Sequence, residues 1–160
     1  MKKLMFTISL FLFCIAAIAN ISAGNYYVTA TGETLSCKKI RLGKDITTAV
    51  LDNGQKVTVP TAHIKMYQLK GKIYEKLPLY ANNQKTSKEV FMQFIGIRSG
   101  LKLYKYSKFV EGYDKATGAY SAPSLVDYYF VFRGDKFWVE VTSQNYPTLF
   151  EFFRINVRES

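Results

Sequence analysis

The chain has 160 residues, and its 22 Lys and Arg outnumber 12 Asp and Glu to give a formal net charge of +10. This length is typical of one domain and is sufficient for a buried core. With two cysteines and one histidine, the chain lacks the four Cys/His ligands of a structural zinc site. We therefore expect neither a metal site nor a cofactor.

Residues 1–23 have the pattern of a secretory signal peptide. Two lysines follow the first methionine, Leu4 to Ile18 carries no charge, and small residues come next. Cleavage is expected after Ala19 or Ala23. The apolar run is shorter than the ~20 residues of a membrane-spanning helix, so no transmembrane segment is expected after cleavage. The sequence thus predicts an exported protein, periplasmic or secreted, for which nucleic acid is not an expected partner.

Removal of this leader leaves a basic chain, 24–160, with 20 Lys and Arg against 12 Asp and Glu, a net charge of +8. Cys37 is then the only cysteine and His63 the only histidine. A lone cysteine forms no internal disulfide, so the core must hold the fold together. Three Cys/His ligands, as in catalytic zinc sites, are no longer present either.

Short segments in which apolar and polar residues alternate predict β-strands. Turn residues join several of them at Asn53-Gly54, Gly71 and Gly134-Asp135, and such dipeptides favour tight hairpins. In chain order, the expected strands are Tyr26–Thr31, Leu35–Arg41, Ile46–Asp52, Gln55–Pro60, His63–Lys70, Lys72–Tyr80, Leu101–Phe109, Val126–Arg133 and Lys136–Thr142.

Alternation also predicts which side chains share a face. In the last hairpin, both faces of the first strand are apolar, which indicates a strand covered on two sides. Its partner strand is expected to bury one face. On the first strand, one face carries Val126, Tyr128, Phe130 and Phe132, and the other carries Tyr129 and Val131. On the second strand, the face expected to be buried carries Phe137, Val139 and Val141. Between Lys72 and Tyr80, Leu79 and Tyr80 are expected on opposite faces.

Three segments are less regular. Residues 87–97 fit either a capped helix or a buried strand, and a short strand is favoured because Gly96 and Gly100 limit its length. Pro147 to Asn156 is expected to form a short helix with Leu149, Phe152, Phe153 and Asn156 along one side. Glu111 to Ser124 is expected to be a long loop. The predicted fold is mainly β: a single antiparallel barrel-like or sandwich-like domain over 24–160 with a minor C-terminal helix.

Catalytic motifs are not evident. Cys37 and His63 could form a nucleophile and base if they met in space, but a buried cysteine and an edge histidine explain them better. Ser36 and Ser99 each precede a lysine by three residues, which is the spacing of the Ser-Lys pattern of some acyl transferases. Neither serine begins a convincing helix, so this pattern does not indicate an active site. Arg133-Gly134-Asp135 spells an adhesion tripeptide, although the turn alone requires this glycine and aspartate. We expect no catalytic residues and no enzyme.

One strand combines positive charge with aromatic rings. Lys102, Tyr104, Tyr106 and Lys108 fall on one face at period two, and Tyr113 and Tyr120 follow in the predicted loop. Rings stack on sugars while lysines attract anions, which makes these six residues a candidate ligand-binding surface. The alternative is a tyrosine-lined face packed on its neighbour, with lysines protecting the strand edge.

Two central segments, Lys72 to Tyr80 and Gly100 to Tyr106, resemble small exported β-rich proteins of Gram-negative bacteria that have no assigned activity. The similarity spans about half of the chain. It implies an envelope or secreted protein.

These observations favour a non-enzymatic binding or structural module of the cell envelope that contacts anionic glycan or lipid headgroups. A β-barrel carrier of a small apolar ligand is the alternative, suggested by the abundance of Phe and Tyr. An enzyme that uses scattered carboxylates is the third reading.

Overall fold

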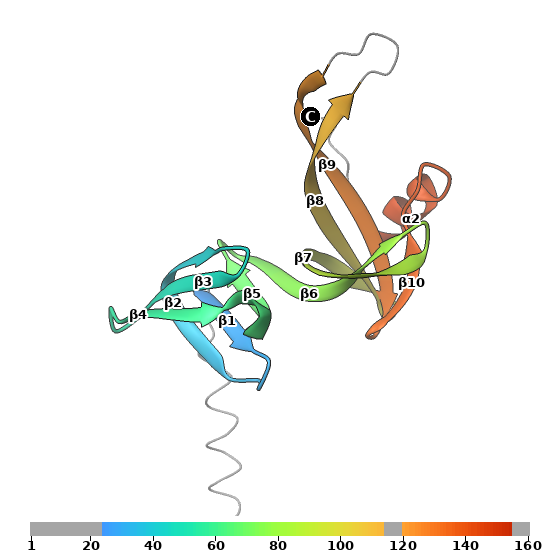
Figure 1. Cartoon of the computed structure of the whole chain (residues 1–160). Coiled ribbons are helices and arrows are strands. Elements are labelled where there is room, and N and C mark those ends of the chain that lie inside the picture. Colours follow the sequence, from blue (N-terminus) through green and yellow to red (C-terminus); the bar gives the residue numbers. More distant parts are fainter. Residues whose placement is uncertain (1–23, 114–119, 155–160) are drawn as a thin grey trace, which may run out of the picture. The chain divides into compact units, whose positions relative to one another are not determined.

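The computed structural model describes residues 24–113 and 120–154, and side chains are not described at 113, 120 and 121. These residues form two compact units that meet in sequence between Gly71 and Lys72. The fold is mainly β and antiparallel, and its one described α-helix lies near the C-terminus (Figure 1). The predicted fold class is therefore confirmed. Each unit has its own buried side chains.

Unit 1 is a five-stranded antiparallel sheet in the order β5-β1-β2-β3-β4. Strands β1 to β4 follow one another as a meander, and β5 returns beside β1 after a 3-10 turn, η1. The sheet ends at β4 and does not close on itself. The elements are β1 Asn25–Thr29, β2 Thr34–Leu42, β3 Ile46–Leu51, β4 Lys56–Pro60, η1 Thr61–His63 and β5 Ile64–Leu69.

The predicted hairpin at Asn53-Gly54 is present, but its loop is longer than two residues. The Gly54 N–H donates to Leu51 O, and the Leu51 N–H donates to Gln55 O. Gly54 has φ +87°, the left-handed conformation that glycine adopts without steric cost. This is a three-residue loop with a bulge at the glycine, the next most common hairpin connection after the two-residue turn.

The interior of unit 1 combines three tyrosine rings, including Tyr26, with isoleucine and small side chains. Tyr27 and Tyr67 are cross-strand partners on β1 and β5 and are both buried. Cys37 is buried and is not in a disulfide. Polar atoms are also enclosed: Thr61 Oγ1 donates to Gly43 O, and Thr47 Oγ1 lies 2.9 Å from Thr61 Oγ1. The hydroxyl pair fixes η1 against the loop between β2 and β3.

The strands of unit 2 pair antiparallel in the order β10-β9-β8-β7-β6. Residues 87–97 lie in a strand, as favoured from the sequence, although this strand is 15 residues long rather than short. It pairs with β6 through its first part and with β8 through its second. The elements are β6 Lys72–Ala81, β7 Gln84–Arg98, β8 Leu101–Tyr113, β9 Tyr120–Arg133, β10 Lys136–Glu140 and α2 Tyr146–Phe153.

Both faces of the β8–β9 pair are covered over Leu101 to Tyr106 and Tyr128 to Phe132, as the sequence predicted for this part of β9. One face carries an aromatic cluster and the other a cluster that includes α2. The aromatic cluster has Met92, Tyr104, Phe130 and Phe132 at its centre, with Leu77, Leu79, Tyr80, Val90, Phe94, Tyr106, Tyr128 and Phe137 around it. The helix-side cluster has Leu101, Leu103, Val131 and Leu149, with Ile95, Tyr129, Val139, Val141, Phe152 and Phe153 around it.

Two predicted faces are wrong because β-bulges interrupt the alternation. On β10 the register shifts between Phe137 and Val139, so Phe137 joins the aromatic cluster whereas Val139 joins the helix side. On β6 it shifts between Pro78 and Tyr80, so Leu79 and Tyr80 both join the aromatic cluster.

The predicted C-terminal helix is present and ends earlier than expected. Leu149, Phe152 and Phe153 contact one cluster, as predicted from their spacing. Arg154 has φ +54° and terminates the helix in the left-handed conformation. Asn156, the fourth residue predicted on this side, lies outside the described residues.

The described parts of the expected loop from Glu111 to Ser124, residues 111–113 and 120–124, are strand, and residues 114–119 lie outside the described residues. Cross-strand pairing continues from Val110 opposite Ser124 to Tyr113 opposite Tyr120. Beyond Lys105, which is the last β8 residue paired with β7, strands β8 and β9 have only each other (Figure 1). They form a two-stranded ribbon whose cross-strand partners Phe109 and Leu125 are 69% and 58% exposed.

Candidate functional site

The surface predicted from Lys102 to Lys108 is not an exposed aromatic face. Tyr104 is 1% exposed, and its ring packs edge-on against Phe94 and Phe132. Its hydroxyl donates to Glu75 Oε2 over 2.9 Å. Burial, followed by the charge and hydrogen bond of Glu75, raises the pKa of Tyr104. This ring belongs to the core and is not accessible to a ligand.

The other predicted site residues are distributed along the same strand. Tyr106 is half-buried beside Tyr128, with ring centroids 6.4 Å apart. Lys102 is half-buried and Lys108 is exposed. The backbones of Tyr113 and Tyr120 are partners at the far end of the β8–β9 pair, and their side chains are outside the described residues. Tyr104 and Tyr106 both belong to the aromatic cluster, so these two rings follow the packed alternative.

The opposite face of this strand carries a small polar cluster. Lys105 Nζ lies 3.1 Å from Asp127 Oδ2, and Ser107 Oγ donates to Asp127 Oδ1 over 2.5 Å. Burial opposes ionisation of Asp127, but the two hydrogen bonds and the lysine charge lower its pKa. The charge of the ionised Asp127 carboxylate is thus balanced by Lys105, and the cluster links β8 to β9 where the two-stranded ribbon begins.

The reactive side chains considered in the sequence are not assembled into a catalytic group. Cys37 is buried in β2, and burial together with the charge of Asp52 raises the pKa of its thiol. A protonated thiol is a poor nucleophile. His63 lines a pocket that Cys37 does not reach. Ser36 lies on a strand and Ser99 in a turn. Among residues 24–113 and 120–154, no three His, Cys, Asp or Glu side chains could together hold a metal ion.

Unit 1 has a cationic face that the sequence analysis did not single out. Cross-strand register places Lys39 opposite Val50 and Val50 opposite Lys56, so three strands contribute to one row. The neighbouring row contains Arg41, Thr48 and Thr58. Residues paired across antiparallel strands point to the same side of a sheet. We call Lys39, Arg41, Thr48, Val50, Lys56 and Thr58 the basic face.

Acidic side chains are absent from the strands of this unit. Residues 24–71 contain seven Lys and Arg against three Asp and Glu, a net charge of +4. Glu33, Asp45 and Asp52 all lie in connections between strands. Within the described residues, none of the three cations of the basic face forms an ion pair. Their charge is therefore free to attract an anion from solution.

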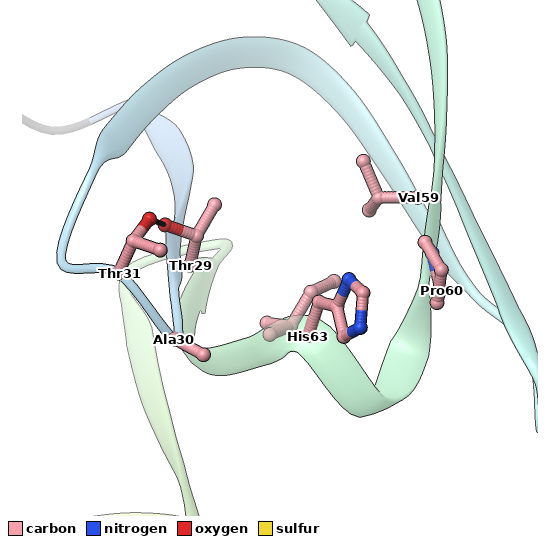
Figure 2. Close-up of a pocket in the computed structure, with 7 residues that line it drawn as sticks. Thr29, Ala30, Thr31, Val59, Pro60 and His63 are labelled. Carbon is pink, nitrogen blue, oxygen red and sulfur yellow. Dashed lines mark hydrogen bonds between the residues drawn. The ribbon is translucent and has the colours of Figure 1, made fainter.

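A small pocket lies elsewhere on unit 1, between the connection that follows β1 and the end of β4. Figure 2 shows the imidazole of His63 between the Thr29–Thr31 pair and the side chains of Val59 and Pro60. The volume of the pocket is about 340 Å³. Its lining residues are Thr29, Ala30, Thr31, Val59, Pro60, His63 and Ile64.

Hydrogen bonds hold the backbone around this pocket in place. The Ala30 N–H donates to His63 O over 2.8 Å, which joins the β1 side to η1. The Thr61 N–H donates to Asp45 O over 2.8 Å, and the Thr61 hydroxyl bonds described above anchor the same turn. Pro60 stands opposite Ile46 at the end of β4 and also lines the pocket, so the pocket adjoins the strand that carries Lys56.

The chain matches no family model, no curated protein and no solved structure. No helix within the described part of the chain has the length and apolar character needed to cross a membrane.

The basic face could have been found from the sequence by one additional step. The sequence predicts that Lys39, Arg41 and Lys56 lie on strands, and the Asn53-Gly54 turn defines the approximate pairing of two of the predicted strands. The bulge between Cys37 and Lys39 shifts the register by one residue, which sequence alternation alone does not indicate. The pocket requires contacts between η1 and the β1 connection and has no local signal.

Proposed function

We propose that this protein is an exported, non-enzymatic module of the cell envelope that binds an anionic glycan through the basic face of unit 1. The observation that supports this function is the register of β2, β3 and β4. It gathers Lys39, Arg41 and Lys56 on one side of the sheet with no carboxylate among their cross-strand neighbours. Adjacent strands lie roughly 4.8 Å apart, so Lys39 and Lys56 are about 10 Å apart at the backbone. That spacing suits a polymer with repeated charges.

A glycan suits this face better than a bilayer. Thr48 and Thr58 lie beside the cations, and their hydroxyls can donate to and accept from sugar hydroxyls. Between residues 24 and 71, Ile46 is the one large hydrophobic residue that is exposed. A single such side chain offers little apolar area for insertion between lipids, on which interfacial binding depends.

Export rests on the leader predicted over residues 1–23. The expectation is cleavage after Ala19 or Ala23, which would place the basic face among envelope polymers. N-terminal sequencing of protein recovered from the periplasm or medium tests this step separately from binding.

The binding experiment compares two triple variants of equal charge. Lys39→Gln, Arg41→Gln and Lys56→Gln together remove the cations of the basic face. The matched control removes three exposed lysines of unit 2, Lys85, Lys88 and Lys136, in the same way. The probes are polygalacturonate, neutral dextran and phosphatidylglycerol vesicles, and binding is measured by sedimentation at low and at physiological salt.

We expect polygalacturonate to bind the wild type in a salt-sensitive manner and dextran not to bind. The basic-face variant should bind roughly tenfold more weakly, since each exposed charge pair contributes about 0.2–1 kcal/mol. The control should change less than about twofold. Equal losses in the two variants, or binding to vesicles without binding to the polyuronate, would contradict the proposal.

A further inference from the structure

The His63 pocket has an apolar floor and polar groups at one side. Val59, Pro60 and Ile64 provide aliphatic surface, and Ile64 is buried. A volume of about 340 Å³ is at the lower end of the range of small-molecule sites. No acidic residue lines it. The pocket is thus suited to a short apolar group.

The polar groups retain hydrogen-bond donors for a ligand. Thr29 Oγ1 and Thr31 Oγ1 lie 2.7 Å apart, and Thr29 Oγ1 also accepts from the Glu33 N–H. The two hydroxyls have two hydrogens, and the bond between them uses one, so whichever threonine donates, one hydrogen remains unused.

His63 offers a second donor. Its imidazole forms no hydrogen bond with any of the described residues, and its backbone carbonyl is held by Ala30. Imidazole has at least one N–H in either protonation state. A hydroxyl donor and an imidazole donor in one pocket call for a ligand with two acceptor sites.

The positive charge of unit 1 indicates which kind of acceptor group the ligand carries. Unit 1 has a net charge of +4, which favours an anion over a neutral carbonyl. A carboxylate has two acceptor oxygens and no donor, and hydrogen bonds to a charged group are about twice as strong as neutral ones. The aliphatic floor requires a short chain next to that carboxylate.

We propose that the His63 pocket binds a small carboxylate with a branched aliphatic chain. The carboxylate accepts hydrogen bonds from His63 and from the Thr29–Thr31 pair, and the chain contacts Val59, Pro60 and Ile64. Because the backbone bonds around η1 exist without ligand, the site is organised before binding. This site does not depend on the basic face or on glycan binding.

The test is a titration followed by NMR, with the His63 ring and the threonine methyl groups as reporters. The probes are isovalerate, isovaleramide, which lacks the charge, and acetate, which lacks the branched chain. Isovalerate should give saturable shifts at these reporters. Isovaleramide and acetate should each bind at least roughly tenfold more weakly, because the first loses the charge-assisted bonds and the second loses apolar contact.

Two variants address the donors separately. His63→Phe keeps a ring without an N–H, and the double variant Thr29→Val, Thr31→Val keeps shape without hydroxyls. Each should weaken isovalerate binding roughly tenfold, while Thr148→Val on α2, a residue that does not line the pocket, should leave affinity unchanged. If the double variant fails to fold, His63→Phe decides alone. Equal affinity for isovalerate and isovaleramide, absence of saturable shifts, or full affinity in His63→Phe would overturn the assignment.

Discussion

The two units of this chain use the same element, the short antiparallel strand, but they differ in what covers the faces of their sheets. In unit 1, strands β2 to β4 bury the face that carries Ile40 and Ala49 and leave Lys39 and Lys56 exposed on the other. Unit 2 buries both faces of β8 and β9 where they pair with β7 and β10, one face under the aromatic cluster and one against α2. Charged residues on the strands of unit 1 therefore mark a surface exposed to solvent. On the strands of unit 2, charged residues stand between residues that are packed in the interior.

This difference explains why the Lys102–Lys108 surface was a natural expectation and why the structure places it otherwise. Period two identifies which residues share a face, but it does not state whether water or another element covers that face. Tyr104 and Tyr106 share a side with Phe130 and Phe132, and the aromatic cluster forms over them. On unit 1 no described element covers the row of Lys39, Val50 and Lys56.

Removing a ring from the aromatic cluster of unit 2 is the strongest test of the difference between the two units. Phe132→Ala removes a ring that is 1% exposed and contacts Tyr80, Tyr104 and Phe137. We expect the free energy of unfolding of unit 2 to fall by about 3–5 kcal/mol. Urea unfolding followed by Trp138 fluorescence measures it, because the chain has one tryptophan and it lies on β10.

Phe109→Ala on the exposed ribbon is the matched control and should change stability by less than about 0.5 kcal/mol. Amide hydrogen exchange in β1 to β5 reports unit 1 in the same samples. A comparable loss from Phe109→Ala would show that burial does not distinguish the two regions.

The second change tests the polar interior of unit 1. Since the single Thr61 hydrogen donates to Gly43 O, Thr47, which is 0% exposed, must donate to Thr61. Thr61→Val leaves the Thr47 hydroxyl buried without a partner, and we expect a cost of about 1–3 kcal/mol. Hydrogen exchange in β1 to β5 detects it.

Thr58→Val makes the same chemical change on the exposed face of β4, where a valine suits a strand. It should be nearly neutral. Similar effects of the two substitutions would contradict the role of the buried hydroxyl pair.

The smallest expected effect concerns Tyr104 and its dependence on pH. The folded-state pKa of Tyr104 is raised above the ordinary value of 10.0, first by burial and then by Glu75. A raised pKa means that this contribution to stability is complete below about pH 10 and is lost as pH rises above that value. Tyr104→Phe should cost about 1 kcal/mol at neutral pH and should flatten the decline of unit 2 stability between roughly pH 9.5 and 11.

Tyr26→Phe in unit 1 is the comparison variant, and it should leave that decline unchanged. An identical alkaline decline in wild type and Tyr104→Phe would show that the buried hydroxyl is not its source.

Much of the architecture was predictable from local pattern. The turn residues at Gly134-Asp135 defined a hairpin, and the spacing of Leu149, Phe152 and Phe153 defined one side of a helix. The predicted faces of β10 and of the end of β6 were wrong because a bulge adds one residue and moves the side chains that follow it to the other side of the sheet. The predicted loop was wrong at 111–113 and 120–124, because cross-strand pairing such as that of Gly112 with Ser121 outweighs the weak local preference of these residues for a strand.

For this protein, the sequence by itself determined the β class, the main turns and the short helix, because strand alternation and turn chemistry act between near neighbours. Only the tertiary structure decided the division into two units, the burial of Tyr104, the row of cations on unit 1 and the pocket at His63. Each of these depends on which distant strands become neighbours and on what covers a face once they have paired. Such long-range contacts leave no signal in any single segment.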